Sequence, residues 1–342
     1  MKVAVVFDTP RKGWGHDDFA REVAAKVEEP EYEIAGALTH NGHDVRLVGV
    51  GPDVRPLLDE LAAYEPDLVF NCTEGFGNKP ALDYLIPALL EAEGYPYTGS
   101  PPLALLTTRN KAISKEVLAY FGIQVPGFAT YRLTEEVRGA PALTFPLIVK
   151  PLQEDASLGI AQASIVRDAD QLADRVAFVH QSFRQAAIAE EFVEGRELYV
   201  SIVGNGDDLD ILPIVEMVFD RRKARRPEER IATRLAKWDV GYRDRKGIRN
   251  VFARPISRRT REHIADICRT AFRALWLRDY ARLDVRLTAD DQVWFIEANA
   301  NPFISLGHDM ANAAEKAGMS YPAFIERIVK EASRRRDADD QA

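Results

Sequence analysis

The sequence predicts an α/β protein whose N-terminal part is a parallel sheet covered by helices and whose remainder forms mixed sheets with helices. Apolar runs at residues 2–8, 44–50 and 67–72 have the length and continuous hydrophobicity of buried parallel strands. Helical patterns lie between the last two runs and after them, as in a helix-covered parallel sheet. At about 150 residues per domain, the 342 residues predict two or three domains.

The chain changes character around residues 99–102, where Gly, Ser and two Pro follow one another. We therefore expect an N-terminal α/β domain at 1–100. Residues 107–123 have lysine and apolar residues at helical spacing, and Val125-Pro126 ends that helix. We expect a strand at 146–152, a Ser/Gly turn at 155–159, a helix around 168–182 and a strand at 187–195, which complete a central domain at 101–193.

The last part of the chain is predicted as a third domain at 194–333. The strands ELYVSIVG and DILPIVEM are followed by a charged stretch at 220–246 with few apolar residues, and a loop of that length is usually functional or mobile. A helix at 257–275, strands at 280–287 and 292–299 and a helix at 321–332 follow. The final residues, 334–342, lack apolar anchors and are expected to fray.

Composition excludes several classes of protein. Acidic residues outnumber basic ones by 53 to 45, for a net charge of −8, so a nucleic acid is not expected as a partner. The apolar run at the start of the chain is too short for a signal peptide, and no stretch of 18 consecutive apolar residues could form a transmembrane helix. The two cysteines lie far apart in the sequence. We expect a soluble, cytoplasmic protein with no membrane partner, in which Cys72 and Cys268 are small buried hydrophobes.

The most informative pattern for chemistry is Asp284, Glu297 and Asn299 on the two strands that flank an acidic turn. Because side chains alternate along a strand, the three oxygen donors can share one face if the strands are antiparallel neighbours. Such a face suits Mg²⁺ held by few carboxylates and by nucleotide phosphates. Spacing alone favours the alternative, a solvated polar face on two edge strands.

Lys111 and Lys150 are the candidate phosphate ligands. Lys150 ends an apolar strand before a proline, and a lysine there is costly unless an anion meets it. Lys111 on a helix could simply face solvent. Small residues at 154–159, among them Ser157 and Gly159, could present backbone N–H groups to a phosphate.

A strand-to-linker segment could frame a nucleoside. Its backbone could bond adenine and a carboxylate could hold ribose, although adjacent glutamates are more often surface residues. The candidates are Glu190, Glu191, Phe192, Val193 and Glu197.

Taken in order, these pieces resemble the ATP-grasp superfamily and, within it, the D-alanine–D-alanine ligase-like enzymes. The similarity covers nearly the whole chain, through GYPYTGSPPLALLTTRNKAISKEVLAYFGIQVP, PLIVKPLQEDASLG, EEFVEGRELYVSIVG, LPIVEM, ARLDVRLT, WFIEANANP and AGMSYPAFIERIV. No single string is decisive, but their shared order is highly specific.

The resemblance implies a three-domain ATP-grasp enzyme that joins a carboxylate to an amine through an acyl phosphate, with ATP and Mg²⁺ or Mn²⁺ as cofactors. Its substrates would be amino acids or peptides, and it would be a homodimer. Lys111 and Lys150 match residues on the nucleotide phosphates, and Ser157 and Gly159 match the phosphate-covering loop. The segment 190–197 matches the adenine and ribose site.

The same resemblance assigns the catalytic and metal positions. Asp284, Glu297 and Asn299 match the magnesium ligands, and Arg282 matches the arginine that stabilises charge on the reacting carboxylate. The stretch 220–246 matches a mobile loop that closes over the site, and Lys237 with Trp238 aligns loosely with its Lys-aromatic pair. Closure would protect an acyl phosphate from water.

The sequence departs from the family at both substrate positions. Glu74 stands where true D-alanine–D-alanine ligases have His, and Asn78-Lys79 replaces an acidic pair. Residues 303–309 replace a Gly-Met-Thr run before the Ser-Leu pair, which places Ser305, His308 and Asp309 near the second substrate. The N-terminal Ser-x-Glu signature is absent, and only Glu31 matches its Glu, ambiguously.

Acidic residues at 74 and 309 would suit cationic groups rather than a free carboxylate. We therefore expect a ligase with rewritten substrate pockets. The alternatives are an authentic cell-wall D-alanine–D-alanine ligase and a nucleotide-binding protein that has lost catalysis.

Overall fold

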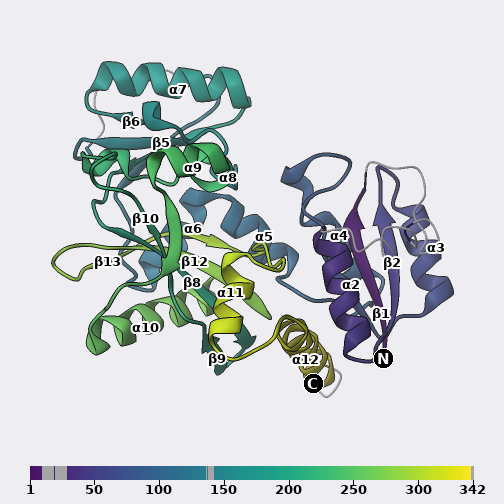
Figure 1. Ribbon diagram of the computed structural model, residues 1–342. Coiled ribbons are helices and arrows are strands. Elements are labelled where there is room, and N and C mark those ends of the chain that lie inside the picture. Colours follow the sequence, from purple (N-terminus) through teal and green to yellow (C-terminus); the bar gives the residue numbers. More distant parts are fainter. Residues whose placement is uncertain (10–18, 20–28, 136, 138–141, 340–342) are drawn as a thin grey trace.

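The computed structural model describes residues 1–9, 19, 29–135, 137 and 142–339. Its strands form three sheets that follow one another along the chain, and the predicted mixed α/β architecture is confirmed (Figure 1). Within this described part, no helix is long and apolar enough to cross a membrane.

The N-terminal sheet is parallel, in the strand order β2-β1-β3. The predicted strands are confirmed as β1 (Lys2–Asp8), β2 (Asp44–Val50) and β3 (Leu68–Asn71). Helices α2 (Pro30–His40), α3 (Arg55–Tyr64) and α4 (Leu85–Ala92) accompany them, with the short helix η1 (Pro80–Leu82). Because β1 lies between its two partners, the carboxyl ends of β1 and β3 form the switch point at which open α/β sheets hold ligands.

The helix predicted at 107–123 is two helices. They are α5 (Pro102–Arg109) and α6 (Lys111–Tyr120), separated at Asn110. The side chain of Asn110 accepts hydrogen bonds from the N–H groups of Ala112 and Ile113, so it caps α6 at a fixed start. Lys111 is therefore placed in the first turn of α6.

The central sheet is antiparallel, in the order β4-β7-β5-β6, and α7 packs on it (Figure 1). Its elements are β4 (Phe128–Tyr131), β5 (Leu147–Pro151), η2 (Gln162–Ser164), β6 (Ile165–Val166), α7 (Ala169–Phe183) and β7 (Ala187–Glu191). The strands at 146–152 and 187–195 and the helix at 168–182 are confirmed, with the second strand ending earlier than predicted.

The third sheet has the order β11-β10-β8-β12-β13, with β9 paired to β8. Its strands are β8 (Arg196–Asn205), β9 (Asp208–Ile211), β10 (Val215–Val218), β11 (Arg249–Phe252), β12 (Tyr280–Leu287) and β13 (Val293–Asn299), and α10 (Arg258–Ala274) lies between β11 and β12 in the chain. DILPIVEM, expected as one strand, is divided into β9 and β10 around Pro213, which has no N–H for a ladder.

The charged stretch 220–246 is not the irregular loop that its composition predicts. It contains η3 (Pro227–Glu229), α8 (Arg234–Trp238) and α9 (Val240–Lys246). The side chains of Thr233 and Asp239 cap the two α-helices, and Ala224, Ile231 and Ala236 are buried. Helices this short depend on caps and a few packed side chains rather than on a periodic apolar face, so the pattern missed them.

The chain ends in α11 (Asp309–Lys316) and α12 (Tyr321–Asp339). α12 packs against α2 and β8, so one hydrophobic core contains residues of the first sheet and of the third. The helix continues through residues predicted to fray, because Arg335 donates to the carbonyl of Tyr97 and pairs with Asp279. Residues 340–342 lie outside the described part.

Candidate functional site

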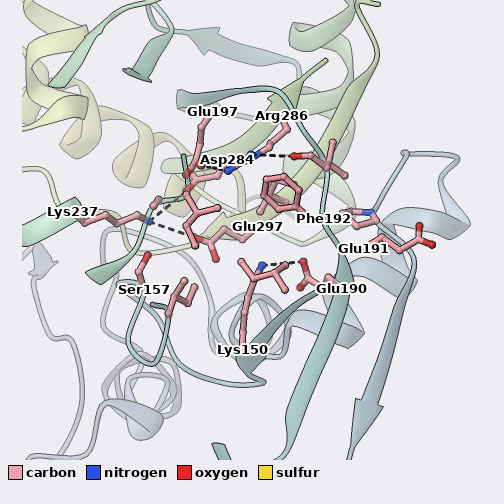
Figure 2. A pocket seen from close by; sticks show the side chains of 17 residues that line it. Lys150, Ser157, Glu190, Glu191, Phe192, Glu197, Lys237, Asp284, Arg286 and Glu297 are labelled. Carbon is pink, nitrogen blue, oxygen red and sulfur yellow. Dashed lines mark hydrogen bonds and ion pairs between the residues drawn. The ribbon is translucent and has the colours of Figure 1, made fainter. Parts of the chain in front are cut away.

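A cavity between the central and third sheets gathers most of the residues expected to bind a nucleotide (Figure 2). Strands of both sheets, the turn after β5 and the segment before α8 contribute to its wall. The charged and polar residues that line it are Lys150, Ser157, Glu190, Glu191, Glu197, Lys237, Asp284, Arg286 and Glu297. Phe192 and Val193 also line it, so the strand-to-linker segment predicted to frame adenine and ribose lies here.

Asp284 and Glu297 face each other across β12 and β13. The two residues are directly paired in antiparallel register, as are Arg282 and Asn299 two positions away. The register shifts just beyond Asp284, and this bulge places Ile296 and Glu297 together in the cavity wall. The three oxygen donors predicted to share one face of two antiparallel strands are thus brought together.

These donors fit a magnesium site completed by phosphates. The amide nitrogen of Asn299 donates to the carbonyl of Arg282 at 3.5 Å, which leaves its oxygen directed elsewhere. Among the residues that the structure describes, no group of three or more His, Cys, Asp or Glu side chains could hold a metal by itself. Two carboxylates and one amide suit Mg²⁺, which keeps waters and takes the remaining ligands from nucleotide phosphates.

Arg282 and Asp284 form a bidentate ion pair. Nε and Nη2 of Arg282 donate to the two carboxylate oxygens of Asp284 at 2.8 and 3.0 Å, and the guanidinium lies 4.8 Å from the ring centre of Tyr199. Burial alone would lower the pKa of Arg282, but the Asp284 carboxylate outweighs burial and holds that pKa above its ordinary value. The pair provides a fixed planar cation beside the carboxylates.

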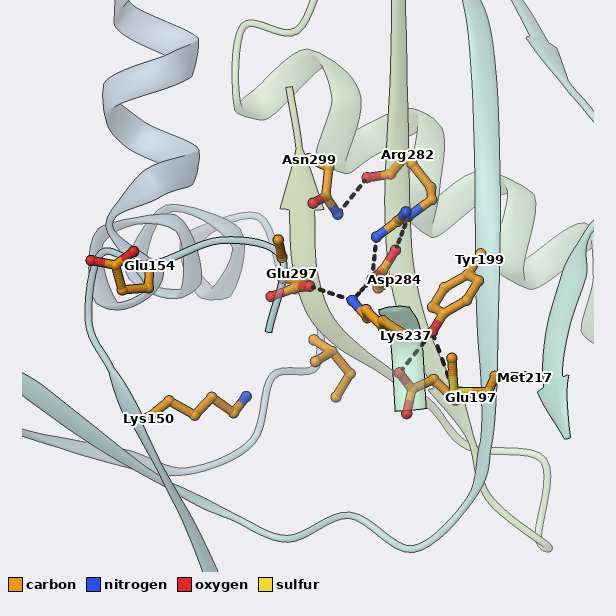
Figure 3. A network of polar contacts seen from close by, with 12 residues as sticks. Lys150, Glu154, Glu197, Tyr199, Met217, Lys237, Arg282, Asp284, Glu297 and Asn299 are labelled. Carbon is orange, nitrogen blue, oxygen red and sulfur yellow. Dashed lines mark hydrogen bonds and ion pairs between the residues drawn. The ribbon is translucent and has the colours of Figure 1, made fainter. Parts of the chain in front are cut away.

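Lys237 extends from α8 toward the same carboxylates (Figure 3). Its Nζ atom lies 3.7 Å from Oε1 of Glu297 and 4.0 Å from Oδ2 of Asp284. Burial would raise the pKa of Glu297, but the ammonium groups of Lys237 and Lys111 outweigh it, so the pKa lies below its usual range. These two ammonium groups therefore favour the ionised form of Glu297.

A buried ion-pair triad lies at the floor of the cavity. Lys150 donates to Oε2 of Glu190 at 2.9 Å, and Lys115 lies 3.3 Å from its other oxygen. Lys115 also donates to the carbonyl of Ile296 at 2.5 Å, the residue displaced by the bulge. Sequence reasoning missed Lys115, although its position four residues after Lys111 places both on one face of α6.

Arg286 is a second residue that sequence reasoning missed. It donates to the carbonyl of Val193 at 3.0 Å and to Oε2 of Glu197 at 2.7 Å, and its guanidinium lies 5.3 Å from the ring centre of Phe192. It therefore fixes the linker segment against β12. The signal was present, because positions 282, 284 and 286 alternate onto one face of a strand.

The turn after β5 is held in a strained conformation. Ala156 and Ser157 have left-handed φ values of 53° and 60°, and Trp238 donates from its indole nitrogen to the carbonyl of Ala156 at 3.0 Å. At Gly159, φ is 78° and an added Cβ would lie 2.6 Å from Pro151, so only glycine fits. Lys111 donates to the carbonyl of Glu154 and does not line the cavity. In the structure, Lys111 holds this turn.

The residues predicted to bind substrates lie outside the cavity between the central and third sheets. Glu74 follows β3, and its backbone N–H donates to Asp8 at the end of β1 at 2.7 Å. Burial raises the pKa of Glu74 above its usual value and that of Asp8 to about 6. Asp8 was not predicted, although an acid at the carboxyl end of a parallel strand is a signal for a ligand site.

The second group of predicted substrate residues surrounds the turn before α11. Ser305 is buried, and the N–H of Leu306 donates to Glu33 on α2 at 2.9 Å, two residues after Glu31. His308 packs edge-on against Phe303 at 4.4 Å between ring centres. This turn, which follows β13, therefore contacts α2 beside the N-terminal sheet.

Asp309 is engaged by a neighbouring side chain. Both of its carboxylate oxygens accept hydrogen bonds from Asn250, at 2.9 and 2.7 Å. It lines a separate cavity beside β11 and α11, together with Phe252 and Lys316. The structure does not bring Asp309 to the cavity between the central and third sheets.

Known proteins resemble this chain in sequence and in structure. A family profile described as "D-ala D-ala ligase C-terminus" matches residues 117–330. The chain is 31% identical to the uncharacterized protein y4sG of Sinorhizobium fredii, over 88% of this chain and 87% of that protein. It is 30% identical to a D-alanine–D-alanine ligase of Bordetella petrii, over 87% and 84% of the two chains, and 32% identical to that of Cupriavidus metallidurans, over 89% and 88%.

The fold has a solved counterpart. A D-alanine–D-alanine ligase of Bacillus anthracis, crystallised with ATP, superimposes with a TM-score of 0.75 at 20% identity, and 99% of each chain is covered. At that identity the likeness concerns the fold.

Proposed function

The chain belongs to the D-alanine–D-alanine ligase-like family of ATP-grasp enzymes and is an ATP-dependent ligase that forms C–N bonds, and we propose that its substrates are not two D-alanines. The observation that carries this proposal is the contrast between two regions. The cavity between the central and third sheets is lined by most of the charged residues expected to meet ATP, among them Lys150, Asp284 and Glu297, whereas the substrate side presents Glu74 beside Asp8.

The reaction begins when the carboxylate of the first substrate attacks the γ-phosphorus of ATP, which gives an acyl phosphate and ADP. In our assignment Lys150 contacts the phosphates, and Glu190 keeps its ammonium aimed into the cavity. Ser157 and Gly159 cover the phosphates from the turn after β5. Glu191, Phe192, Val193 and Glu197 frame adenine and ribose, and Arg286 orders that frame.

Asp284, Glu297 and Asn299 would hold Mg²⁺, or Mn²⁺ in its place. The bound ion neutralises phosphate oxygens during transfer. Lys237 lies against the same carboxylates, and its ammonium can follow the transferred phosphoryl group. Little covalent chemistry is left for the protein, because positioning and charge stabilisation supply most of the catalysis in phosphoryl transfer.

In the second step the amine of the other substrate attacks the acyl carbon, and phosphate leaves to give the amide. Arg282 supplies a rigid cation for the oxyanion of the tetrahedral intermediate, because Asp284 and the Tyr199 ring fix its plane. The proton that the attacking amine loses is carried away by the departing phosphate, which leaves as hydrogen phosphate. Lys237 and Trp238 close the segment before α9 over the turn at 154–159 and keep water from the acyl phosphate.

The substrate side is proposed to accept a substrate with a cationic group. Asp8 and Glu74 lie where an open α/β sheet holds its ligand, and burial raises the pKa of each carboxyl group, so that a positive charge placed beside them would stabilise their ionised forms. Because Asp309 lines a separate cavity beside β11 and α11, we place recognition of the cation at Asp8 and Glu74. Glu31, Ser305 and His308 would border the second substrate.

We further propose the division into domains at 1–100, 101–193 and 194–333, a cytoplasmic location and a homodimer. The homodimer can be checked by the sedimentation of the purified protein.

The test is ADP release by the purified enzyme with ATP and Mg²⁺ over a panel of D- and L-amino acids, alone and in pairs with amines, with the amide identified by mass spectrometry. We expect turnover with a substrate that carries an additional amine or guanidine, and little with D-alanine alone. Robust turnover with D-alanine alone would show an authentic D-alanine–D-alanine ligase. Nucleotide binding without amide formation on any pair would indicate a protein that has lost catalysis.

A further inference from the structure

Arg109 joins three parts of the molecule outside the residues that line the nucleotide cavity. It is the last residue of α5, two positions before Lys111, and its side chain is only 9% exposed. Nη2 donates to Oδ2 of Asp83 at 2.5 Å and lies 3.2 Å from Oδ2 of Asp155, while Nη1 donates to the carbonyl of Gln153 at 3.3 Å. The guanidinium therefore connects the N-terminal domain to the turn after β5.

That turn is the one expected to cover the phosphates, and it is anchored at several carbonyls. Lys111 holds the carbonyl of Glu154 and Trp238 that of Ala156, while Arg175 donates to the carbonyl of Gly159 at 2.7 Å. Because Ala156 and Ser157 are in left-handed conformations, the turn needs such outside contacts to stay in place.

Asp83 lies on the substrate side of the contact. It follows η1 in the segment that begins with Glu74 at the end of β3, and it is 8% exposed. One of its oxygens accepts from Arg109, while the other has no hydrogen-bond partner among the described residues. A movement of this segment therefore acts directly on the guanidinium.

A buried ion pair is weak evidence for a stabilising role, because desolvation of the two charges offsets their attraction. The planar guanidinium instead suits a geometric role, since it presents several donors in one plane and can meet Asp83, Asp155 and Gln153 at once. No lysine could bond these three groups with the same spacing.

We propose that Arg109 is a positioning residue that couples the Asp83 segment of the substrate domain to the phosphate-covering turn. The proposal rests on the assignment of the cavity to ATP. If so, Asp83 of the N-terminal domain influences nucleotide affinity, although Asp83 does not line the nucleotide cavity.

The experiment is isothermal titration of the purified enzyme with the non-hydrolysable analogue AMP-PNP and Mg²⁺, so that no amino-acid substrate is required. Arg109→Met should raise the Kd about tenfold, and Asp83→Asn about threefold, within the range of coupling between contacting residues. The double variant should bind no more weakly than Arg109→Met, because both changes break one connection. Arg109→Lys keeps the positive charge but lacks the planar guanidinium, so its Kd should lie between those of the wild type and Arg109→Met.

Arg335→Met is the matched control. Arg335 is another poorly exposed arginine that bonds a carbonyl and an aspartate between domains, at Tyr97 and Asp279, away from the phosphate turn. The Arg335→Met variant should have a lower melting temperature, and its Kd for AMP-PNP should stay within about twofold of the wild-type value. If Arg109→Met does not fold, Asp83→Asn and Arg109→Lys decide the question.

An Asp83→Asn variant that binds like the wild type, or effects that add in the double variant, would overturn the coupling while the proposed function stands. The coupling would also be overturned if Arg335→Met lost as much affinity as Arg109→Met, because a general loss of structural stability would then explain both results. A wild-type enzyme that does not bind AMP-PNP would overturn both this inference and the nucleotide site.

Discussion

Asp284 and Glu297 meet only because two strands pair in one register, and that register determines what each carboxylate can do. A shift of one residue would turn either side chain to the other face of the sheet. The bulge after Asp284 keeps the pair aligned while it places Ile296 in the cavity wall. The chemistry of the site is therefore set by a few residues and by one irregularity in a strand.

Replacement of Asp284 by Asn should reduce amide formation by about a hundredfold or more, because magnesium contributes several kcal/mol to phosphoryl transfer. The same change frees Arg282 from its bidentate partner. Amide yield and ADP release, measured against Mg²⁺ concentration, check the prediction. Asp290→Asn, an exposed carboxylate in the turn between the same strands, is the control. Normal Mg²⁺ dependence in Asp284→Asn would refute the metal assignment.

The pKa of Asp8 predicts how activity depends on pH. Burial raises this pKa to about 6, with Glu74 and Asp83 as further negative groups nearby. Below pH 6 Asp8 becomes neutral and attracts a cationic substrate less, so kcat/KM should fall by up to about tenfold per pH unit. Above pH 6 the value should level off. In the Asp8→Asn variant the fall of kcat/KM below pH 6 should disappear. If the fall persists, another group is responsible for it.

At the scale of the element, the segment 220–246 is a cover built from short helices. α8 carries Lys237 to the carboxylates and Trp238 to the turn after β5, while Arg243 on α9 donates to the carbonyl of Ala236 at 2.7 Å. Contacts from both helices therefore hold one short piece of chain over the cavity. We propose that this cover opens and closes, since few apolar side chains anchor it.

Lys237→Met should lower kcat by about a hundredfold, the loss typical of one charge-stabilising group. It should also increase ATP hydrolysis relative to amide formation, because a loosened cover admits water to the acyl phosphate. The measurement is the ratio of ADP to amide. Lys246→Met, at the exposed end of α9, should keep the wild-type ratio. An unchanged ratio in Lys237→Met would count against a role in closure.

At the scale of the molecule, the N-terminal sheet and the third sheet share one core. Side chains of β1 and α2 lie in the same apolar cluster as Phe324 and Ile328 on α12 and Tyr280 on β12. The N-terminal sheet is thus joined to the rest of the molecule by packing as well as by the contacts of Arg109 and Arg335.

Phe324→Ala should destabilise the protein by about 3–5 kcal/mol, the usual cost of removing a fully buried aromatic ring. Because the core is shared, thermal denaturation should show the N-terminal sheet and the third sheet unfolding together at a lower temperature. Tyr120→Ala, which removes an aromatic side chain that is 87% exposed, should change little. A scan in which only part of the unfolding heat shifts would show that the two sheets unfold independently.

Much of this arrangement could be predicted from the sequence, because the signals were local. The strands β1, β2, β5, β12 and β13 follow continuous or alternating apolar runs, and their positions are confirmed. The two cysteines were expected as small buried hydrophobes, and Cys268 is fully buried in the core while Cys72 is partly exposed. The break at Asn110 and the short helices α8 and α9 were missed, because caps and a few contacts define them.

The sequence by itself determined which residues carry charge, in what order, and on which face of a strand, because alternation along a strand is a local property. It therefore predicted Asp284, Glu297 and Asn299 as one group, and the structure brings them together. Only the tertiary structure decided that Lys115 bonds Glu190 and Arg286 bonds Glu197 beside the cavity, that Asn250 bonds Asp309, and that Arg109 connects Asp83 to the turn after β5. Those relations join residues distant in the chain, and no local pattern records which partner will meet them.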